Sequence, residues 1–188
     1  MKNVFDNAKV FDNAKVFNDA QVSGNAWVSK NAQISGNAQI SGNAQVSGNA
    51  GVSGNAQVSG DAQVSGNARV SGNTQIFGDA RVSGNAQIFG NARVSGDAQI
   101  FGNTRVSGNA GVSGDADILV IGPATSSGRY TTAHKDSVIG LRVNCGCFSG
   151  TIDMFEAAIA ATHADDPNYL KEYLLFAALI RCKFGLES

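Results

Sequence analysis

Hydrophobic and polar positions alternate along the first part of the chain with an unbroken period of six residues. Every sixth residue from Val4 to Ile118 is Val or Ile, and Ala or Thr stands two places before almost all of them. Side chains two residues apart in an extended backbone share a face, so each unit predicts a short strand with one apolar and one polar face. The Gly-Asn or Gly-Asp pair after most strands supplies a corner, because Gly adopts positive φ at little cost.

Three such units complete one triangular coil of eighteen residues, so the twenty units predict about seven coils of stacked parallel strands. The interior of this column consists of Val and Ile with small Ala between them, while Gln, Ser and Asn face solvent. Burying each β-branched side chain contributes roughly 1.5–3 kcal/mol, which is the main favourable term for folding. The sequence therefore predicts a mainly β protein, with a parallel β-helix over residues 1–117.

The repeated pattern [Val/Ile]-x-Gly-[Asn/Asp]-[Ala/Thr]-x resembles the hexapeptide repeat of left-handed parallel β-helix proteins, a family that includes many acyltransferases. The resemblance covers about residues 3–120 and implies a left-handed solenoid, with a homotrimer as the expected assembly. Acyltransferases of this kind use a His base, usually near a loop extruded between coils. This repeat contains no His and its spacing never breaks, so the resemblance in fold does not extend to the activity.

The period ends near Asp117, and residues 118–188 predict a small α+β domain that serves for capping or oligomerisation. Apolar residues 118–121, followed by alternating segments 129–134 and 138–143, indicate two or three strands, with a bend over residues 144–150. Two helices follow. Thr151 is placed to cap the first, which is expected to reach about residue 163, and Asp166-Pro167 opens the second, with Gly185 at its C-terminal cap.

Both parts of the chain carry apolar side chains that the predicted cores do not accommodate. A twelve-residue period places Phe on a different face of the solenoid each time, which disfavours an aromatic platform for single-stranded nucleic acid and favours a protein interface. The last helix is apolar around nearly its whole circumference, so we expect it to be buried between subunits or against the last coil. The predicted interface residues are Phe77, Phe89, Phe101, Tyr173, Phe176, Leu179 and Ile180.

Composition and charge exclude several classes of partner. The formal net charge is −1, which gives no reason to expect a nucleic-acid or anionic membrane partner. Cys145, Cys147 and Cys182 form an odd set, and Cys-x-Cys is not the usual spacing of a structural zinc site, so we expect a reducing cytoplasm, no disulfides and no metal. We also predict no cofactor and no catalytic residue. An acyltransferase with an unusual site stays an alternative.

One cluster of polar residues is a candidate binding site. Basic and aromatic side chains gather on the strand pair of the C-terminal domain, and they could hold a small anionic ligand or remain merely solvated. These residues are Arg129, Tyr130, His134, Lys135 and Arg142.

The C-terminal segment itself carries a second resemblance. Residues 143–156, together with Thr162-His163 and Glu172-Tyr173-Leu174, resemble a small module of uncharacterised phage and prophage proteins of Gram-positive bacteria. In that module the segment at His163 commonly reads His-Gly-Asp, whereas this chain has His163-Ala164-Asp165.

The resemblance implies a non-catalytic structural or binding protein in the cytoplasm of a bacterial host or associated with the virion. The alternative is an antagonist of host defence that binds a host protein or sequesters a small nucleotide-like messenger.

Overall fold

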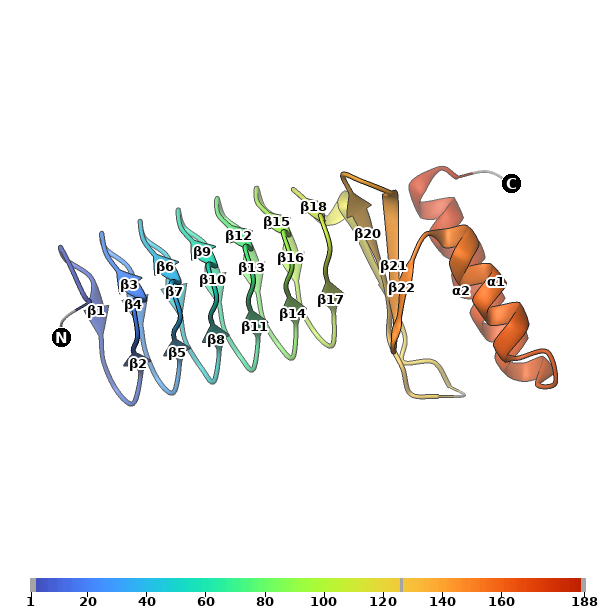
Figure 1. Cartoon of the computed structure of the whole chain (residues 1–188), viewed down its shortest axis with the longest axis horizontal. Helices are drawn as coiled ribbons and strands as arrows, with labels where there is room; N and C mark the ends of the chain where they lie inside the picture. Colours follow the sequence, from blue (N-terminus) through green and yellow to red (C-terminus); the bar gives the residue numbers. More distant parts are fainter. Residues whose placement is uncertain (1–2, 126, 187–188) are drawn as a thin grey trace. The chain divides into compact units, whose positions relative to one another are not determined.

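The computed structural model of the protein describes residues 3–125 and 127–186 and divides into two compact units, Met1–Asp115 and Ala116–Ser188. Figure 1 shows the first unit as a stack of coils and the second as a sheet with two helices. Each unit is described by itself.

The first unit consists of two-residue strands stacked in successive coils (Figure 1). In each strand an outward residue is followed by Val or Ile, whose side chain points inward. Within the described residues they are β1 (Lys9–Val10), β2 (Lys15–Val16), β3 (Gln21–Val22), β4 (Trp27–Val28), β5 (Gln33–Ile34), β6 (Gln39–Ile40), β7 (Gln45–Val46), β8 (Gly51–Val52), β9 (Gln57–Val58), β10 (Gln63–Val64), β11 (Arg69–Val70), β12 (Gln75–Ile76), β13 (Arg81–Val82), β14 (Gln87–Ile88), β15 (Arg93–Val94), β16 (Gln99–Ile100), β17 (Arg105–Val106) and β18 (Gly111–Val112).

Every third strand stacks in register on the same face, which forms three parallel sheets of six strands. Residues eighteen apart are partners throughout, as in Val46 with Val64. The predicted parallel β-helix is therefore confirmed, but it has about six coils and not seven. The first predicted strand forms only an isolated bridge from Val4 to Val22, and the last, at Ile118, belongs to the antiparallel sheet of the second unit.

Glycine corners allow the coils to stack this closely. Gly72 has φ +78°, and a Cβ atom there would lie 2.7 Å from the carbonyl oxygen of Gly90 in the next coil. In the first coil, Asp6 and Asp12 adopt the same left-handed conformation. The Asp6 carboxylate accepts a hydrogen bond from the backbone N–H of Gly24 at 2.9 Å, so an acidic side chain here bridges two corners.

Apolar and polar columns run along the solenoid. The inward Ala and Val or Ile side chains from Ala20 to Val112 are almost completely buried. Along the corners, Asn side chains form hydrogen-bonded columns. The amide of Asn49 donates to Asn67 at 3.1 Å, and the amide of Asn67 donates to Asn85 at 3.0 Å. The predicted sorting of apolar residues inward and polar residues outward is confirmed.

The second unit is a four-stranded antiparallel sheet with two helices. After the short 3-10 helix η1 (Asp115–Asp117), strands β19 (Ile118–Ile121), β20 (Thr131–Asp136), β21 (Gly140–Cys145) and β22 (Phe148–Gly150) lie side by side in that order (Figure 1). The bend predicted over residues 144–150 is wrong in part. Asn144 and Cys145 continue β21, and only Gly146 and Cys147 form the turn into β22.

Both helices begin where their caps predict. The hydroxyl of Thr151 accepts a hydrogen bond from the N–H of Met154 before α1 (Ile152–Thr162), and Asp166 accepts from Asn168 and Tyr169 before α2 (Pro167–Phe184). Gly185 ends α2 with φ 65°. Within the part of the chain that the structure describes, no helix is both long and apolar enough to span a membrane.

The core of the second unit lies between the sheet and the helices. Its buried members are Ala124, Ala133, Leu141, Val143, Ile152, Phe155, Ile159, Tyr173, Ala177 and Ile180. The unit itself therefore covers one face of α2, whereas the sequence predicted that this helix is buried between subunits or against the last coil. One face of a sheet and one neighbouring helix are enough to bury one face of an apolar helix.

Candidate binding site in the C-terminal unit

The structure does not gather the five predicted binding residues into one site. His134 and Arg142 are cross-strand partners on β20 and β21. They occupy the face opposite Ala133 and Val143, because successive residues of a strand point to opposite faces, and Ala133 and Val143 lie in the core under the helices. Arg129 lies in the loop before β20.

His134 and Arg142 belong to a buried polar network. The Nδ1–H of His134 donates to the carbonyl of Lys135 at 3.0 Å, which leaves Nε2 to accept from the amide of Asn144 at 3.2 Å. The Nε of Arg142 donates to the Asp136 carboxylate at 2.7 Å. Burial lowers the pKa of His134 below its ordinary value, so the imidazole is neutral at pH 7.

Two of the predicted cationic groups are already paired. Burial alone would raise the pKa of Asp136, but hydrogen bonds from Arg142 and from the N–H groups of Val138 and Ile139 outweigh it and lower that pKa. The ammonium group of Lys135 lies 2.5 Å from the carboxylate of Asp117. Both cations are therefore compensated by carboxylates within their own unit.

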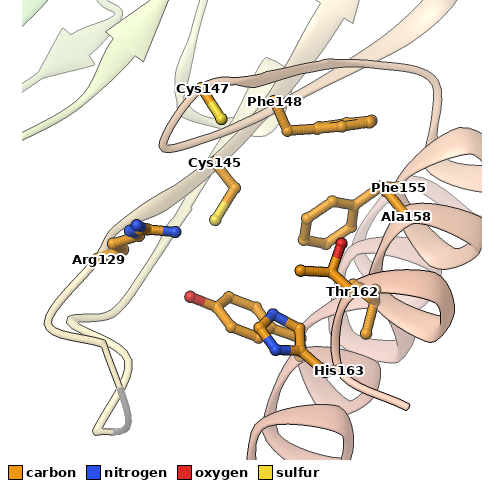
Figure 2. A pocket seen from close by; sticks show the side chains of 10 residues that line it. Arg129, Cys145, Cys147, Phe148, Phe155, Ala158, Thr162 and His163 are labelled. Carbon is orange, nitrogen blue, oxygen red and sulfur yellow. The ribbon is translucent and has the colours of Figure 1, made fainter. Parts of the chain in front are cut away.

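A cavity of about 130 Å³ lies on the helix side of the sheet (Figure 2). Residues from β21, β22, the turn between them, α1, α2 and the loop before β20 surround it. The lining consists of Arg129, Cys145, Cys147, Phe148, Phe155, Ala158, Ile159, Thr162, His163 and Tyr173.

Aromatic rings form much of the wall of this cavity. The rings of Phe148 and Phe155 are 5.3 Å apart, and Phe155 meets Tyr173 edge to face at 6.3 Å. The imidazole of His163 stacks on Tyr173 at 5.5 Å and on Tyr169 at 5.2 Å. His163 thus lies between two phenol rings, which fixes the wall at the end of α1.

Hydrogen bonds tie the loop that carries Arg129 to helix α2. The Thr125 N–H and hydroxyl both donate to one carboxylate oxygen of Glu172, at 2.6 and 2.8 Å. The hydroxyl groups of Ser127 and Tyr173 are 2.7 Å apart. Burial raises the pKa of Tyr173, so its phenol stays protonated. The loop is therefore held on the same helix that forms the cavity wall.

Arg129 is the cationic group of this cavity. Within residues 3–125 and 127–186, none of the ion pairs joins its guanidinium to a carboxylate. Its side chain lies against the turn at Gly146, and Figure 2 shows it beside Cys145, across the cavity from Phe155 and His163. Tyr130, its neighbour in sequence, is half-buried. Of the five predicted binding residues, Arg129 alone lines the cavity.

The predicted interface residues differ in exposure. Phe77 and Phe89 are half-buried under arginine side chains of the next coil, whereas Phe101 is 64% exposed. On α2, Tyr173 and Ile180 are buried in the core of their own unit, and Phe176 packs partly against it. Their burial needs no second subunit.

The remaining apolar surface of α2 is formed by leucines. Leu174, Leu175 and Leu179 are all exposed, and Leu175 is 60% exposed. Leu179 was among the predicted interface residues, whereas Leu174 and Leu175 were not. Their position on the solvent side could not be read from sequence, because the helix is apolar on every side.

No metal-binding group is apparent among the described residues. The three cysteines are free, and within that part of the chain no cluster of three or more His, Cys, Asp or Glu side chains could hold a metal ion.

Comparison with known proteins concerns the solenoid. The family model of the YdcK beta solenoid repeat matches residues 20–36, 38–54, 44–60, 62–76, 86–99 and 98–114, which together are less than half of the chain. A comparison with curated proteins finds no match. The matched segments all lie in the first unit, so the solenoid of this chain is similar to the YdcK beta solenoid repeat.

Proposed function

We propose that this chain is a non-catalytic structural or binding protein of phage or prophage type, in which the β-solenoid is a scaffold for a C-terminal interaction domain. The observation that carries the proposal is the unbroken spacing of the strands from β1 to β18. The corner columns of Asn side chains bond to one another along the solenoid. A surface that satisfies its own hydrogen bonds suits a rigid scaffold.

The scaffold is proposed to act as a homo-oligomer, with a trimer as the favoured form. Leu174, Leu175 and Leu179 give α2 an exposed apolar surface in a unit whose core is already complete. Such surfaces on otherwise polar proteins are typical of protein interfaces. Phe101, on the solenoid, is another exposed apolar residue that a subunit could cover. The proposed location is the bacterial host cytoplasm or the virion.

Sedimentation velocity on the full chain tests the assembly. We expect one discrete oligomer at micromolar concentration and expect Leu175→Lys to dissociate it, because a buried unpaired ammonium is costly. Val138→Lys is the matched control, since Val138 is 70% exposed on the hairpin of the same unit. A wild-type chain that sediments as a monomer would contradict the proposed oligomer. Turnover of acetyl-CoA by the purified chain would instead support the acyltransferase alternative.

A second candidate function is sequestration of a small ligand by an antagonist of host defence. The cavity beside Arg129 favours it, because an uncompensated guanidinium next to aromatic walls suits an anionic ligand. The volume of about 130 Å³ is close to that of an engineered cavity of about 150 Å³ that holds one benzene molecule. A whole nucleotide is larger than that, so the cavity suits a smaller molecule, or only one part of a nucleotide-like messenger whose remainder stays in solvent.

A further inference from the structure

We propose that the cavity of the C-terminal unit binds a small organic carboxylate with one ring or one branched apolar chain, and that Arg129 holds the carboxylate. This inference deepens the small-ligand candidate above and rests on it only for the placement of the site. It does not depend on oligomerisation.

The size and chemistry of the walls define the apolar part of the ligand. Phe148, Phe155 and Ile159 provide apolar surface, and the stacked His163 and Tyr173 rings close one side. A cavity of about 130 Å³ holds roughly one six-membered ring. Aromatic walls favour a flat ring, which can meet them by offset stacking or edge-to-face contact.

The charge of the cavity defines the polar part of the ligand. Arg129 is its cationic residue, and no carboxylate among the described residues pairs with it. A guanidinium matches the geometry of a carboxylate with two parallel hydrogen bonds. Figure 2 places Arg129 on one side of the cavity and Phe155, Thr162 and His163 on the other. A ring among the aromatic side chains can therefore direct its carboxylate toward Arg129.

The rim of the cavity is held in place before any ligand arrives. Thr125 and Ser127 attach the Arg129 loop to Glu172 and Tyr173 of α2 through three hydrogen bonds. Backbone bonds from Ala124 to Arg129 and from Gly128 to Ala124 close the same loop. Because Thr125, Ser127 and Arg129 are already held by these bonds, the site loses less conformational entropy on binding.

Isothermal titration of the full chain with benzoate tests the proposal, and benzyl alcohol is the neutral comparison. We expect saturable one-to-one binding of benzoate at millimolar concentration. Arg129→Gln should weaken benzoate binding by about tenfold, which is the effect of losing one charge-assisted contact, and should leave the weaker binding of benzyl alcohol unchanged. Equal binding of the two probes by the wild-type chain would overturn the role of Arg129.

Filling the cavity provides an independent test. Ala158 lines the cavity, whereas Ala157 is exposed on the same helix. We expect Ala158→Leu to abolish benzoate binding and Ala157→Leu to preserve it. Undiminished benzoate binding by Ala158→Leu, or no binding by the wild-type chain, would overturn the proposed site. Because sedimentation measures assembly separately, a failure here is distinguishable from a failure of the scaffold proposal.

Discussion

The guanidinium carbon of Arg93 lies 4.8 Å from the centre of the Phe77 ring, one coil away. Arg105 lies over Phe89 in the same way, at 4.9 Å. The Phe and Arg positions each recur every twelve residues, and an arginine sixteen residues after a phenylalanine is its diagonal neighbour in the next coil. The residue sixteen positions after Phe101 is Asp117, so Phe101 has no corresponding arginine. Of Phe77, Phe89 and Phe101, the first two are thus paired with arginines within the solenoid.

Loss of the arginine from such a pair should reduce stability slightly. We expect Arg93→Gln to lower the free energy of unfolding by about 0.5–1 kcal/mol, the range for exposed cation–π contacts. Arg81→Gln is the matched control, because the diagonal position in the preceding coil is Ser65. Urea denaturation followed by circular dichroism measures both. Equal losses in the two variants would show that the ring contact contributes nothing.

Three glycines separate the effect of backbone strain from that of steric overlap. Gly51 lies at an outward strand position with open space around its Cβ site, so Gly51→Ala should be neutral or stabilising by about 0.5 kcal/mol. Gly102 has φ +72° but no atom near that site, and Gly102→Ala should cost about 1–2 kcal/mol. Gly72→Ala should cost most, since Cβ would lie 2.7 Å from the oxygen of Gly90.

Thermal denaturation of these three variants ranks the two effects. Similar losses for Gly102→Ala and Gly72→Ala would mean that left-handed geometry alone, without close approach of the coils, explains the corner glycines.

Thr74 replaces the usual inward Ala and donates a hydrogen bond from its hydroxyl to the carbonyl of Ser71 at 2.7 Å. Thr74→Val keeps the volume but removes this donor, so we expect a loss of about 1 kcal/mol. Thr74→Ser keeps the donor and loses only a methyl group. If chemical denaturation finds Val more stable than Thr, burial of the added methyl group outweighs the hydrogen bond.

Acidification should destabilise the second unit through His134. Burial lowers the pKa of the folded imidazole below 6.5, so the unfolded state binds more protons between that lowered value and about 6.5. The melting temperature should therefore fall as pH decreases below about 6.5 and should be insensitive to His134 at higher pH. Asp136, whose pKa is also lowered, acts in the same direction at more acidic pH.

Melting curves of the wild-type chain and His134→Gln, followed by circular dichroism, measure this dependence, which should be weaker in the variant. An NMR titration of the wild-type imidazole gives the same information if the variant does not fold. A folded-state midpoint at or above the ordinary value would contradict the prediction.

The sequence predicted two features well. The repeated Val and Ile predicted the solenoid, because each residue has an equivalent neighbour eighteen positions away. Thr151, Asp166 and Gly185 predicted the helix ends, because capping is local chemistry. The number of coils was overestimated because the same Val or Ile pattern continues past the last parallel strand. Ile118 fits the period but pairs with His134 in an antiparallel sheet.

The candidate site could be predicted only in small part. Arg129 was predicted as a basic residue of the strand pair, whereas it lies in the loop before β20. Alternation along β20 and β21 places His134 and Arg142 on the face away from the helices. The cavity arises where Cys145, Phe155 and Tyr173 meet, and these residues come from three elements whose packing no local pattern specifies. The Cys-x-Cys-Phe segment was visible in the sequence, but nothing in it showed that the side chains face a cavity.

The equivalence of successive coils bears on how such a gene can change. Residues 38–55 form one full turn between neighbours of nearly the same sequence. Strand partners and bonded Asn side chains are eighteen positions apart, and the backbone N–H groups that join the coils bond to carbonyls seventeen positions ahead. Unequal recombination that removes or duplicates eighteen codons would leave the backbone ladder continuous. Length is thus a quantity that evolution can adjust in whole steps, without redesigning either end of the protein.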